Sequence, residues 1–487
     1  MTAPSRSETN HHPYGTTQPM LLAGEWVTSD EIAEVRDPED GALVGLVSHA
    51  RTQDAVRALD FAARARTTAA AMASHQRATI LSKAASIVEA EAESFAILIA
   101  SEGIKTIREA RAEVARCVIT FRLSADAAQR VTGETIAFDQ RPGSERRTGY
   151  YTREPLGVVL AITPFNDPLN LVAHKVGPAV ASGNAVILKP HEQTPLTALK
   201  LADVLLRAGL PPPVLQVLPG RGHEIGPLLL RDDRIRLVSF TGGYETGQRI
   251  AATAGLKRLE MELGSNCPTI VLGDADIERA SRSIVSGAFW AAGQNCLHVQ
   301  RVLAERSIAG ELRDRLVALT EQVLVGEKRS SATDMGCLVS EAAAHRIERS
   351  VASAGAAGAL LLTGGKRQGA RFAPTLIEQV PDDHPIARDE VYGPVTVLRE
   401  VGCLDDAINV ANATSFGLQA AIFTRDLEHA HRAVRELEVG AVMVNESSDY
   451  RMDGMPFGGV KASGLGREGV QASILAMTEP KVACFTY

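Results

Sequence analysis

The sequence predicts an α/β protein with a doubly wound, Rossmann-type parallel sheet followed by a second α/β region. Between Gly157 and Phe240, four short runs of apolar residues alternate with segments of helical pattern, as expected for parallel strands that are buried on both faces. A further series of apolar strands begins near Thr269 and ends near Asn445. With 487 residues, of which 45% are hydrophobic, the chain is long enough for two or three domains with separate cores.

A tail, a helical segment and a β-ribbon precede the predicted sheet. Residues 1–19 are rich in Ser, Thr, Asn, His and Pro and lack the basic start and apolar run of a signal peptide, so we expect a flexible tail. Apolar residues recur three and four positions apart between Thr52 and Arg130, which predicts helices. Short β-like pieces around a polar turn from Val131 to Arg153 predict a projecting ribbon. The four strands of the sheet then occupy residues 157–162, 185–188, 214–218 and 237–240.

The charge and the cysteine content favour a cytoplasmic protein with small-molecule ligands. The net charge of −7 gives nucleic acid and anionic membranes no long-range attraction, and no apolar run approaches the roughly 20 residues of a membrane span. The six cysteines are spaced without CxxC pairs or clustered histidines, which is typical of free thiols in a reducing compartment. We therefore expect no nucleic-acid partner, no membrane and no metal.

One cysteine and one glutamate suggest covalent chemistry on a carbonyl compound. Cys296 follows Gly293-Gln294-Asn295, and Glu262 lies 34 positions upstream, so that both are expected in glycine-punctuated loops. A cysteine thiolate would trap an aldehyde as a thiohemiacetal, and loss of hydride would then give a thioester. A carboxylate that deprotonates water could hydrolyse this thioester. A lone cysteine is more often a buried structural residue, however, so its surroundings must decide.

Segments at the ends of the predicted strands suggest a dinucleotide site, because such sheets bind ligands beyond the carboxyl ends of their strands. Phe240-Thr241-Gly242-Gly243 follows a strand and opens a helix, where backbone N–H groups favour a phosphate; a plain βα turn has the same pattern. Glu192, just after Lys189, would accept from a ribose 2′-hydroxyl and repel a 2′-phosphate, which favours NAD over NADP. A solvated loop would also hold these two residues. Gly220-Arg221-Gly222 is a weaker pattern, interpreted mainly as a turn before a helix.

Taken together, these segments resemble the aldehyde dehydrogenase superfamily from about Leu21 to Lys481. Seven motifs occur in the order and spacing of that family: Ile162-Thr163-Pro164-Phe165-Asn166, Lys189-Pro190-His191-Glu192-Gln193-Thr194-Pro195, Phe240-Thr241-Gly242-Gly243, Glu262-Leu263-Gly264, Gly293-Gln294-Asn295-Cys296, Glu390-Val391-Tyr392-Gly393-Pro394-Val395 and Pro456-Phe457-Gly458-Gly459-Val460-Lys461. The resemblance reverses the interpretation of Cys296 as a structural cysteine.

The resemblance implies a catalytic centre. It assigns Cys296 as the nucleophile and Glu262 as the general base, and it forms the oxyanion hole from the Asn166 amide and the backbone N–H of Cys296. Preorganised donors of this kind commonly lower a barrier by a few kcal/mol. Lys175, in the helix after the oxyanion loop, matches a position that the family uses near the catalytic centre.

The resemblance also implies NAD as the cofactor, with NADP possible. Lys189 and Glu192 would hold the adenosine ribose, Gly242 and Gly243 would lie near the pyrophosphate, and Glu390 would hold the nicotinamide ribose. The full set of expected cofactor-binding residues is Thr163, Pro164, Phe165, Lys189, Glu192, Gly222, Phe240, Thr241, Gly242, Gly243, Leu263, Glu390 and Tyr392.

Three kinds of unit follow from the same resemblance. Residues 20–130 and 149–262 are expected to form the NAD-binding domain, and residues 263–473 the catalytic domain. Residues 131–148 and 474–487 resemble the oligomerisation elements of the family. A homodimer or homotetramer is therefore expected.

Departures from the family pattern point to a short polar aldehyde as substrate. Many members carry aromatic residues after the oxyanion asparagine, whereas this chain has Asp167 and His174, with Asn170 between them, and Leu297 follows the nucleophile. Aromatic residues make up only 4% of the chain, which argues against a wide apolar tunnel for fatty or aryl aldehydes.

Arg451, in the family's substrate loop, has two interpretations. It could clamp a carboxylate, phosphate or phosphonate, or it could form an ordinary ion pair with Asp449 or Asp453. The loop is similar to that of lactaldehyde- and phosphonoaldehyde-oxidising members, so we expect a hydroxy-, phospho- or phosphono-aldehyde such as lactaldehyde, phosphonoacetaldehyde or phosphonoformaldehyde.

Other activities remain open at this point. A CoA-acylating semialdehyde dehydrogenase would transfer the acyl group to CoA, although a base at Glu262 favours water. A neutral or amino aldehyde is a further alternative substrate. A cysteine hydrolase would need a histidine partner that the sequence does not assign to Cys296, and a non-enzymatic role would leave Cys296, Glu262 and Asn166 without a use.

Overall fold

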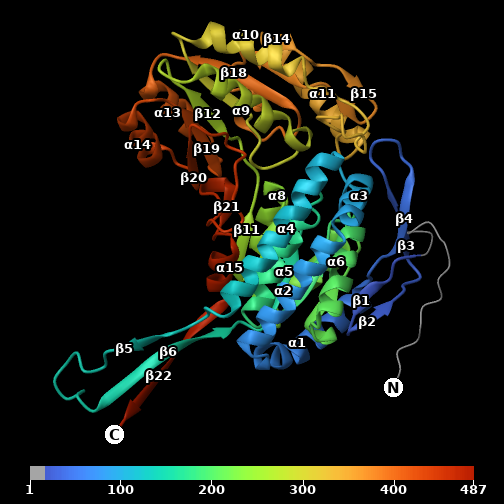
Figure 1. Cartoon of the computed structure of the whole chain (residues 1–487), viewed down its shortest axis with the longest axis vertical. Coiled ribbons are helices and arrows are strands. Elements are labelled where there is room, and N and C mark those ends of the chain that lie inside the picture. Colours follow the sequence, from blue (N-terminus) through green and yellow to red (C-terminus); the bar gives the residue numbers. More distant parts are fainter. Residues whose placement is uncertain (1–16) are drawn as a thin grey trace.

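The protein, described here by a computed structural model over residues 17–487, contains two large β-sheets and a small three-stranded sheet (Figure 1). The predicted α/β fold with a Rossmann-type sheet is confirmed. Most of the predicted tail, residues 1–19, lies outside the described residues, but Gln18 already forms a β-bridge with Val47. None of the helices in residues 17–487 combines the length and apolar character needed to cross a bilayer.

The first sheet has eight strands in the order β2-β1-β9-β8-β7-β10-β11-β21. Its five central strands are parallel, and β1, β2 and β21 add antiparallel edges. The strands are β1 (Met20–Leu22), β2 (Glu25–Val27), β7 (Val158–Ile162), β8 (Ala185–Lys189), β9 (Leu215–Val217), β10 (Leu237–Thr241), β11 (Arg258–Glu262) and β21 (Gly464–Leu465).

Helices cover both faces of this sheet. Alternate residues of its central strands point to opposite faces and pack into two different apolar clusters. The helices of this part are α1 (Thr52–Ala71), α2 (Ser74–Ala90), α3 (Ala92–Glu102), α4 (Ile107–Ala128), α5 (Asn170–Ala181), α6 (Pro195–Ala208), α7 (Gly222–Arg231), α8 (Tyr244–Ala254) and α15 (Val470–Ala476). The predicted all-helical segment from Thr52 to Arg130 is thus confirmed, and Gly222 opens a helix as expected.

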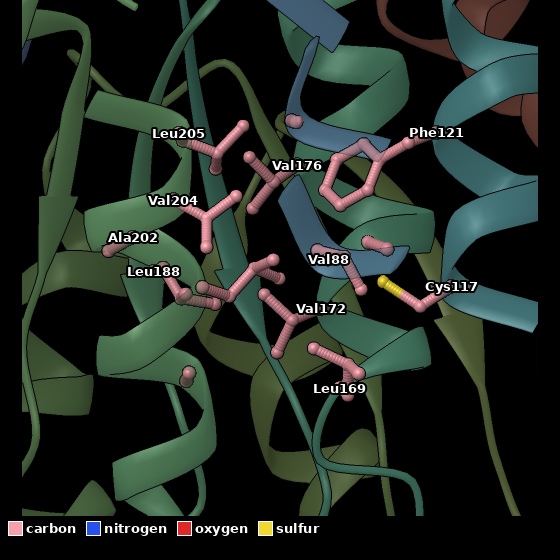
Figure 2. Close-up of a cluster of buried hydrophobic side chains, with 14 of the residues drawn as sticks. Val88, Cys117, Phe121, Leu169, Val172, Val176, Leu188, Ala202, Val204 and Leu205 are labelled. Atoms are coloured by element: carbon pink, nitrogen blue, oxygen red, sulfur yellow. The ribbon is translucent and has the colours of Figure 1, made fainter. Parts of the chain in front are cut away.

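The core on one face of the sheet joins helices that are far apart in the chain. Figure 2 shows Val88 of α2, Val176 of α5, Leu205 of α6 and Leu188 of β8 in one cluster of buried side chains. Cys117 of α4 lies in the same cluster, fully buried, so it has a structural role.

A capping box fixes the start of α4. The Thr106 hydroxyl accepts from the backbone N–H of Glu109, and the Glu109 carboxylate accepts from the backbone N–H of Thr106 at 2.7 Å. Glu109 also accepts from the backbone N–H of Ala291 at 2.7 Å. The same carboxylate therefore ties the first turn of α4 to the loop that precedes Cys296.

The second sheet has seven strands in the order β14-β17-β18-β13-β12-β19-β20, all parallel except β14. Its strands are β12 (Pro268–Val271), β13 (Arg301–Glu305), β14 (Leu360–Thr363), β17 (Thr375–Glu378), β18 (Val395–Val401), β19 (Gln419–Phe423) and β20 (Ala441–Val444). The helices around it are α9 (Ile277–Phe289), α10 (Ala309–Thr320), α11 (Glu341–Ala356), α12 (Pro385–Arg388), α13 (Leu404–Asn412) and α14 (Leu427–Glu436). A short hairpin of β15 (Arg367–Gln368) and β16 (Arg371–Phe372) lies beside α11.

Smaller β elements complete the fold. The predicted ribbon is present: β5 (Glu134–Ile136), β6 (Arg147–Pro155) and β22 (Thr478–Thr486) form an antiparallel sheet that projects from the body of the molecule (Figure 1). The hairpin of β3 (Ile32–Arg36) and β4 (Leu43–Ser48) was not predicted.

Strand register brings the candidate site residues to one edge of the first sheet. Ile162 at the end of β7 pairs with Lys189 at the end of β8, and Thr241 at the end of β10 pairs with Glu262 at the end of β11. The expectation that Glu262 lies in a loop was therefore wrong. β11 was missed because its two glutamates, Glu260 and Glu262, break the apolar pattern, although both side chains are buried.

Candidate active site

A cavity of about 1640 Å³ opens beyond the carboxyl ends of β7, β8, β10 and β11. Cys296, Glu262 and Asn166 all line it, as does every predicted cofactor-binding residue. Of the predicted substrate residues, Asp167, Leu297 and Arg451 line the cavity. The remaining predicted site residues lie behind its wall: Lys175, Asn170 and His174.

The turn before Cys296 is strained and firmly held. Ala291, Ala292 and Gly293 are consecutive residues in the left-handed region, with φ values of 51°, 53° and 68°, which is unfavourable for alanine. A Cβ on Gly293 would lie 2.3 Å from the carbonyl oxygen of Gly393, so only glycine fits there. The Gln294 side chain donates to the Cys337 carbonyl at 3.3 Å and accepts from the Val339 N–H at 2.9 Å. Such strain is commonly maintained where it places a functional group.

Cys296 is partly exposed to the cavity, unlike Cys117, Cys267 and Cys337, which are buried. Burial raises the pKa of the Cys296 thiol above its usual range, and the nearby Arg451 guanidinium acts in the opposite direction. The cation therefore favours the thiolate, which is the reactive form.

Glu262 has a buried carboxylate, and neither of its oxygens has a hydrogen-bond partner among residues 17–487. Burial raises the pKa of Glu262 well above its usual range, and the charge of Glu468 adds to this shift. A Cβ on Gly458 would lie 2.6 Å from one carboxylate oxygen, so glycine there leaves room for the side chain. An unpaired carboxylate of raised pKa that faces a cavity is suited to general-base chemistry.

Asn166 follows the loop at the end of β7 and is buried, with no partner for its side-chain oxygen among the described residues. Asn166 thus lines the same cavity as Cys296, and its side-chain oxygen is not engaged by another of the described residues. This position is compatible with the predicted oxyanion role, in which the amide N–H would donate to the substrate.

Lys175, Glu468 and Arg451 form a buried ion network beside Glu262. The Lys175 Nζ lies 3.1 Å from Glu468 Oε2 and 3.1 Å from the Ser239 hydroxyl, and Arg451 Nη2 lies 2.6 Å from Glu468 Oε1. Although burial opposes ionisation, the two cations hold the pKa of Glu468 far below its usual range. Lys175 therefore acts on the site through Glu468 rather than by direct contact.

The expected role of Arg451 requires correction. Its ion-pair partner is Glu468 and neither Asp449 nor Asp453, and its guanidinium lies 3.9 Å from the centroid of the Phe457 ring. Arg451 is not a free bidentate clamp, because one face and one nitrogen are already occupied. Its Nε, however, is buried without a partner among residues 17–487.

Asp167 belongs to a row of charges that the sequence did not reveal. Lys105, in the turn between α3 and α4, contacts both Asp167 and Glu113, the latter at 2.8 Å. Arg116 of α4 pairs with Asp453 at 2.9 Å and approaches Asp167 at 3.5 Å. Lys105 and Arg116 also line the cavity. No local pattern marks these two residues, since the partner of Arg116 lies 337 positions later in the chain.

Asn170 and His174 do not line the cavity, which corrects their expected contact with the substrate. Both are fully buried on α5 and turn toward Asp453: the Asn170 amide donates to it at 3.1 Å, and His174 Nε2 lies 3.0 Å from it. Burial and the Arg451 charge lower the pKa of His174. These two residues position Asp453, which in turn positions Arg116.

The adenosine side of the predicted cofactor site contains hydrogen-bond donors and acceptors that could bind ribose and phosphate groups. The Lys189 ammonium donates to the Pro190 carbonyl at 2.8 Å and to no other group among residues 17–487, and burial lowers its pKa to about 8. Glu192 is exposed at the cavity edge. The Thr163 and Thr241 hydroxyls are buried without partners among the described residues. These donors and acceptors fit the ribose and phosphate groups of NAD or NADP.

Backbone geometry makes room for a phosphate before α8. A Cβ on Gly242 would lie 2.6 Å from the Phe240 ring, and Gly243 is the N-cap residue of α8 with open space around it. The first backbone N–H groups of the helix therefore face the cavity unobstructed, which suits a pyrophosphate.

Glu390 and Tyr392 lie at the other end of the predicted cofactor site. Glu390 accepts from the backbone N–H of Ser265 at 2.8 Å, and burial raises its pKa to about 7. A Cβ on Gly264 would lie 2.5 Å from the Glu390 carboxylate. Tyr392 has a φ of 51° and packs edge-to-face against Phe165, with ring centroids 6.0 Å apart. The fixed Glu390 carboxylate can accept from ribose hydroxyls.

Neither a metal cluster nor a histidine partner for Cys296 is formed by the described residues. Residues 17–487 contain no group of three or more His, Cys, Asp or Glu side chains arranged to hold a metal ion. His298, two residues after the nucleophile, is buried and bonds the Val395 carbonyl at 3.1 Å, so it does not face the cavity.

Comparison with known proteins agrees with this geometry. Residues 26–483 match the model of the aldehyde dehydrogenase family. The chain is 48% identical to aspartate-semialdehyde dehydrogenase 1 of Pseudomonas canavaninivorans over 93% of this chain and 96% of that one. It is 42% identical to 3-sulfolactaldehyde dehydrogenase of Priestia aryabhattai over 95% of this chain and 97% of that one.

Solved structures give the same result. Aldehyde dehydrogenase 21 from Physcomitrella patens, in complex with the product succinate, superposes with a TM-score of 0.95 at 36% identity over 97% of this chain and 98% of that chain. NADP-dependent glyceraldehyde-3-phosphate dehydrogenase from Bacillus halodurans, in complex with NADP, superposes with a TM-score of 0.94 at 37% identity. The match covers 97% of this chain and 99% of that chain. The chain therefore belongs to the aldehyde dehydrogenase family and is an NAD(P)-dependent aldehyde dehydrogenase.

Proposed function

We propose that the protein oxidises a short, polar aldehyde to the carboxylic acid, with water as the acyl acceptor and Cys296 as the covalent centre. The observation that carries this proposal is the buried Glu262 carboxylate, which has no partner among the described residues and faces the same cavity as the Cys296 thiol. A base in this position can take the proton of the water molecule that hydrolyses a thioester on Cys296.

The proposed reaction has two stages. The Cys296 thiolate adds to the aldehyde carbon, and the carbonyl oxygen becomes an oxyanion held by the Asn166 amide and the backbone N–H of Cys296. NAD or NADP, when bound, serves as the hydride acceptor, and a thioester remains on Cys296. Glu262 then takes a proton from water as the water oxygen adds to the thioester carbon, and the Cys296 thiolate leaves as the acid forms.

The substrate class follows from the charges around the nucleophile. Lys105, Arg116 and Arg451 line the cavity, each beside an acidic side chain, so this part of the cavity suits a polar substrate better than an apolar one. Hydroxy-, phospho- and phosphono-aldehydes remain candidates. The names of the relatives add 3-sulfolactaldehyde and aspartate semialdehyde, and the product in one solved relative is succinate. All of these are short and polar, and most carry an anionic group.

The test is the rate of NADH or NADPH formation with purified protein. The panel includes lactaldehyde, phosphonoacetaldehyde, succinic semialdehyde, aspartate semialdehyde and hexanal. We expect turnover with at least one short polar aldehyde, little with hexanal, and none after Cys296→Ser. Retention of aldehyde oxidation by Cys296→Ser would disprove the mechanism.

Acyl transfer to CoA is the second candidate, and Glu262 disfavours it. An assay without CoA distinguishes the two: hydrolysis gives many turnovers, whereas a CoA-dependent enzyme stops after about one per active site.

We also propose a homodimer or homotetramer that uses the ribbon of β5, β6 and β22, with the domain boundaries expected from the sequence. A cytoplasmic location is supported by the six cysteines, which all lie within residues 17–487 and form no disulfide.

A further inference from the structure

Two carboxylates that line the same cavity as Cys296 have no counter-charge among the described residues. Glu446 and Asp449 line the catalytic cavity, and neither forms an ion pair with any of residues 17–487. The Glu446 carboxylate accepts from the backbone N–H of Ser447 at 2.9 Å, which does not neutralise it. The cations that line this part of the cavity are already paired with other acids: Lys105 with Asp167 and Glu113, Arg116 with Asp453, and Arg451 with Glu468.

The loop that carries Asp449 is fixed against the nucleophile loop. The Ser448 hydroxyl donates to the carbonyl of Leu297, the residue after Cys296, at 3.0 Å. The Gln419 amide donates to the carbonyls of Ser448 and Tyr450 at 2.7 and 2.8 Å. Asp449 is therefore held within the cavity wall next to Cys296.

The helix behind Asp449 leaves space for its carboxylate. A Cβ on Gly287 of α9 would lie 2.9 Å from Asp449 Oδ1 and 2.2 Å from the Ser447 hydroxyl. Only glycine at this position allows the loop to pack so closely on α9.

Two aromatic rings line the cavity beside these acids. Trp290 and Tyr450 are 37% and 51% exposed and both line the cavity. An aromatic face attracts a cation, and Trp does so most strongly. Acids together with aromatic rings form a surface suited to an ammonium group.

Arg451, two residues after Asp449, is a cation that also lines the cavity. Its side chain is only 7% exposed, and Arg451 Nη2 is paired with Glu468 Oε1. The part of the guanidinium that reaches the cavity can donate to a carboxylate. A ligand that meets both residues would carry an acceptor for Arg451 and a cation for Asp449.

We propose that Asp449, assisted by Glu446 and Trp290, binds the ammonium group of a zwitterionic semialdehyde while the Arg451 guanidinium binds its carboxylate. This inference rests on the proposed function and narrows its substrate to an aldehyde with an α-amino acid end. An aldehyde with only negative groups would meet two unbalanced carboxylates, whereas a zwitterion neutralises one of them and also has an acceptor for Arg451.

A matched pair of substrates tests the ammonium contact. Aspartate 4-semialdehyde and succinic semialdehyde have the same length and the same carboxylate, and only the first has the ammonium group. We expect the wild-type protein to prefer aspartate semialdehyde in kcat/KM. Asp449→Asn should lower kcat/KM for aspartate semialdehyde roughly tenfold to hundredfold, the effect of losing one charge-assisted hydrogen bond, and change the value for succinic semialdehyde less than about twofold.

Three controls accompany this experiment. Asp449→Glu keeps the charge and should restore part of the preference. Arg451→Lys should lower kcat/KM for both substrates together, because both have the carboxylate. Asp126→Asn changes an exposed carboxylate of α4 that does not line the cavity and should leave both values unchanged.

The outcomes separate this inference from the function on which it rests. If Asp449→Asn lowers both semialdehydes or lactaldehyde to the same extent, the residue supports the loop or binds a hydroxyl group, and the ammonium contact is wrong. A wild-type preference for succinic semialdehyde would also overturn it. If no aldehyde of the panel gives NADH or NADPH, the proposed function itself fails.

Discussion

Glu262 combines burial, an unpaired carboxylate and a position at the end of a strand. In our proposal it activates water only in the second stage of the reaction. Glu262→Gln keeps the shape of the side chain but removes the base. We expect steady-state turnover to fall roughly 10²- to 10⁴-fold, while a burst of NADH or NADPH near one equivalent per active site remains in stopped-flow measurements. Turnover near the wild-type value, or loss of the burst, would contradict this role.

The pH profile should report the same carboxylate. Burial and the Glu468 charge raise the pKa of Glu262, and a protonated carboxyl group cannot accept a proton from water. Turnover should therefore fall as the pH decreases through the raised pKa, above the value of about 4.3 for an ordinary glutamate. The measurement is kcat against pH, with Glu262→Gln as the control that lacks this limb. If kcat instead falls only near pH ~4.3, the pKa of Glu262 is not raised in the working enzyme.

Glu192 should determine the preference between the two cofactors. Its exposed carboxylate lies at the cavity edge beside Lys189, where it would repel a 2′-phosphate. We expect Glu192→Gln to raise kcat/KM for NADP relative to NAD by about tenfold. The control is Glu245→Gln, which changes another exposed carboxylate that lines the cavity, in the first turn of α8. An unchanged ratio in Glu192→Gln would remove Glu192 from cofactor selection.

At the scale of elements, a buried ion pair joins the β3–β4 hairpin to the chain after α10. The Lys328 ammonium lies 2.7 Å from Asp37 and donates to the Gly103 carbonyl at 2.6 Å, and both charged side chains are buried. Removal of one partner leaves a buried, unpaired charge, which costs about 3–5 kcal/mol. Lys328→Met should therefore lower Tm by several degrees in a thermal scan, whereas Lys83→Met, at an exposed position of α2, should not. Equal Tm values would show that the pair contributes little.

The sequence predicted those elements whose pattern is local. β7, β8 and β10 are buried on both faces, so each is a continuous apolar run, and the helices from Thr52 to Arg130 repeat at three and four. β11 was missed because Glu260 is buried within it, where it accepts from the Ser239 hydroxyl at 2.9 Å. This partner comes from the neighbouring strand and is not visible in a single segment.

In the candidate site, too, some features were predicted from local sequence motifs and others were not. Cys296, Glu262 and the glycine-rich turns were predicted because each lies in a short motif. The contacts of Arg116 with Asp453 and of Arg451 with Glu468 were not predicted, because they depend on how α4 and the substrate loop approach each other. Charge neutralisation is a property of that tertiary arrangement, and residue type alone does not determine it.

At the scale of the molecule, the two large sheets meet at the cavity. The first sheet contributes Glu262 and most of the cofactor residues, and the chain of the second sheet contributes Cys296, Glu390 and Arg451. β21, which follows the substrate loop, returns to pair with β11 through Gly464 and Glu262. This strand couples the position of Glu262, the proposed general base, to the segment that carries Arg451 and Glu468, so the proposed catalytic centre depends on both sheets.

The ribbon of β5, β6 and β22 exposes apolar and aromatic side chains. It projects from the body (Figure 1), and it exposes Val482, Phe485 and Tyr150, which are 58%, 52% and 43% exposed. Phe485 and Tyr150 pack on each other with centroids 6.1 Å apart. Apolar residues on a projecting sheet with open edges favour association with another chain.

We therefore expect the double variant Val482→Asp, Phe485→Asp to lose the assembly. The two substitutions place one carboxylate on each face of β22, because side chains alternate along a strand. A carboxylate buried in an interface is unfavourable without a counter-charge. Light scattering after gel filtration should give a multiple of 51.8 kDa for the wild type and a smaller multiple for the variant. Leu256→Asp is the matched control, because Leu256 is a fully exposed apolar residue that is distant from the ribbon in the chain. An unchanged mass of the variant would place the interface elsewhere, and a wild-type mass of one chain would contradict the proposed oligomer.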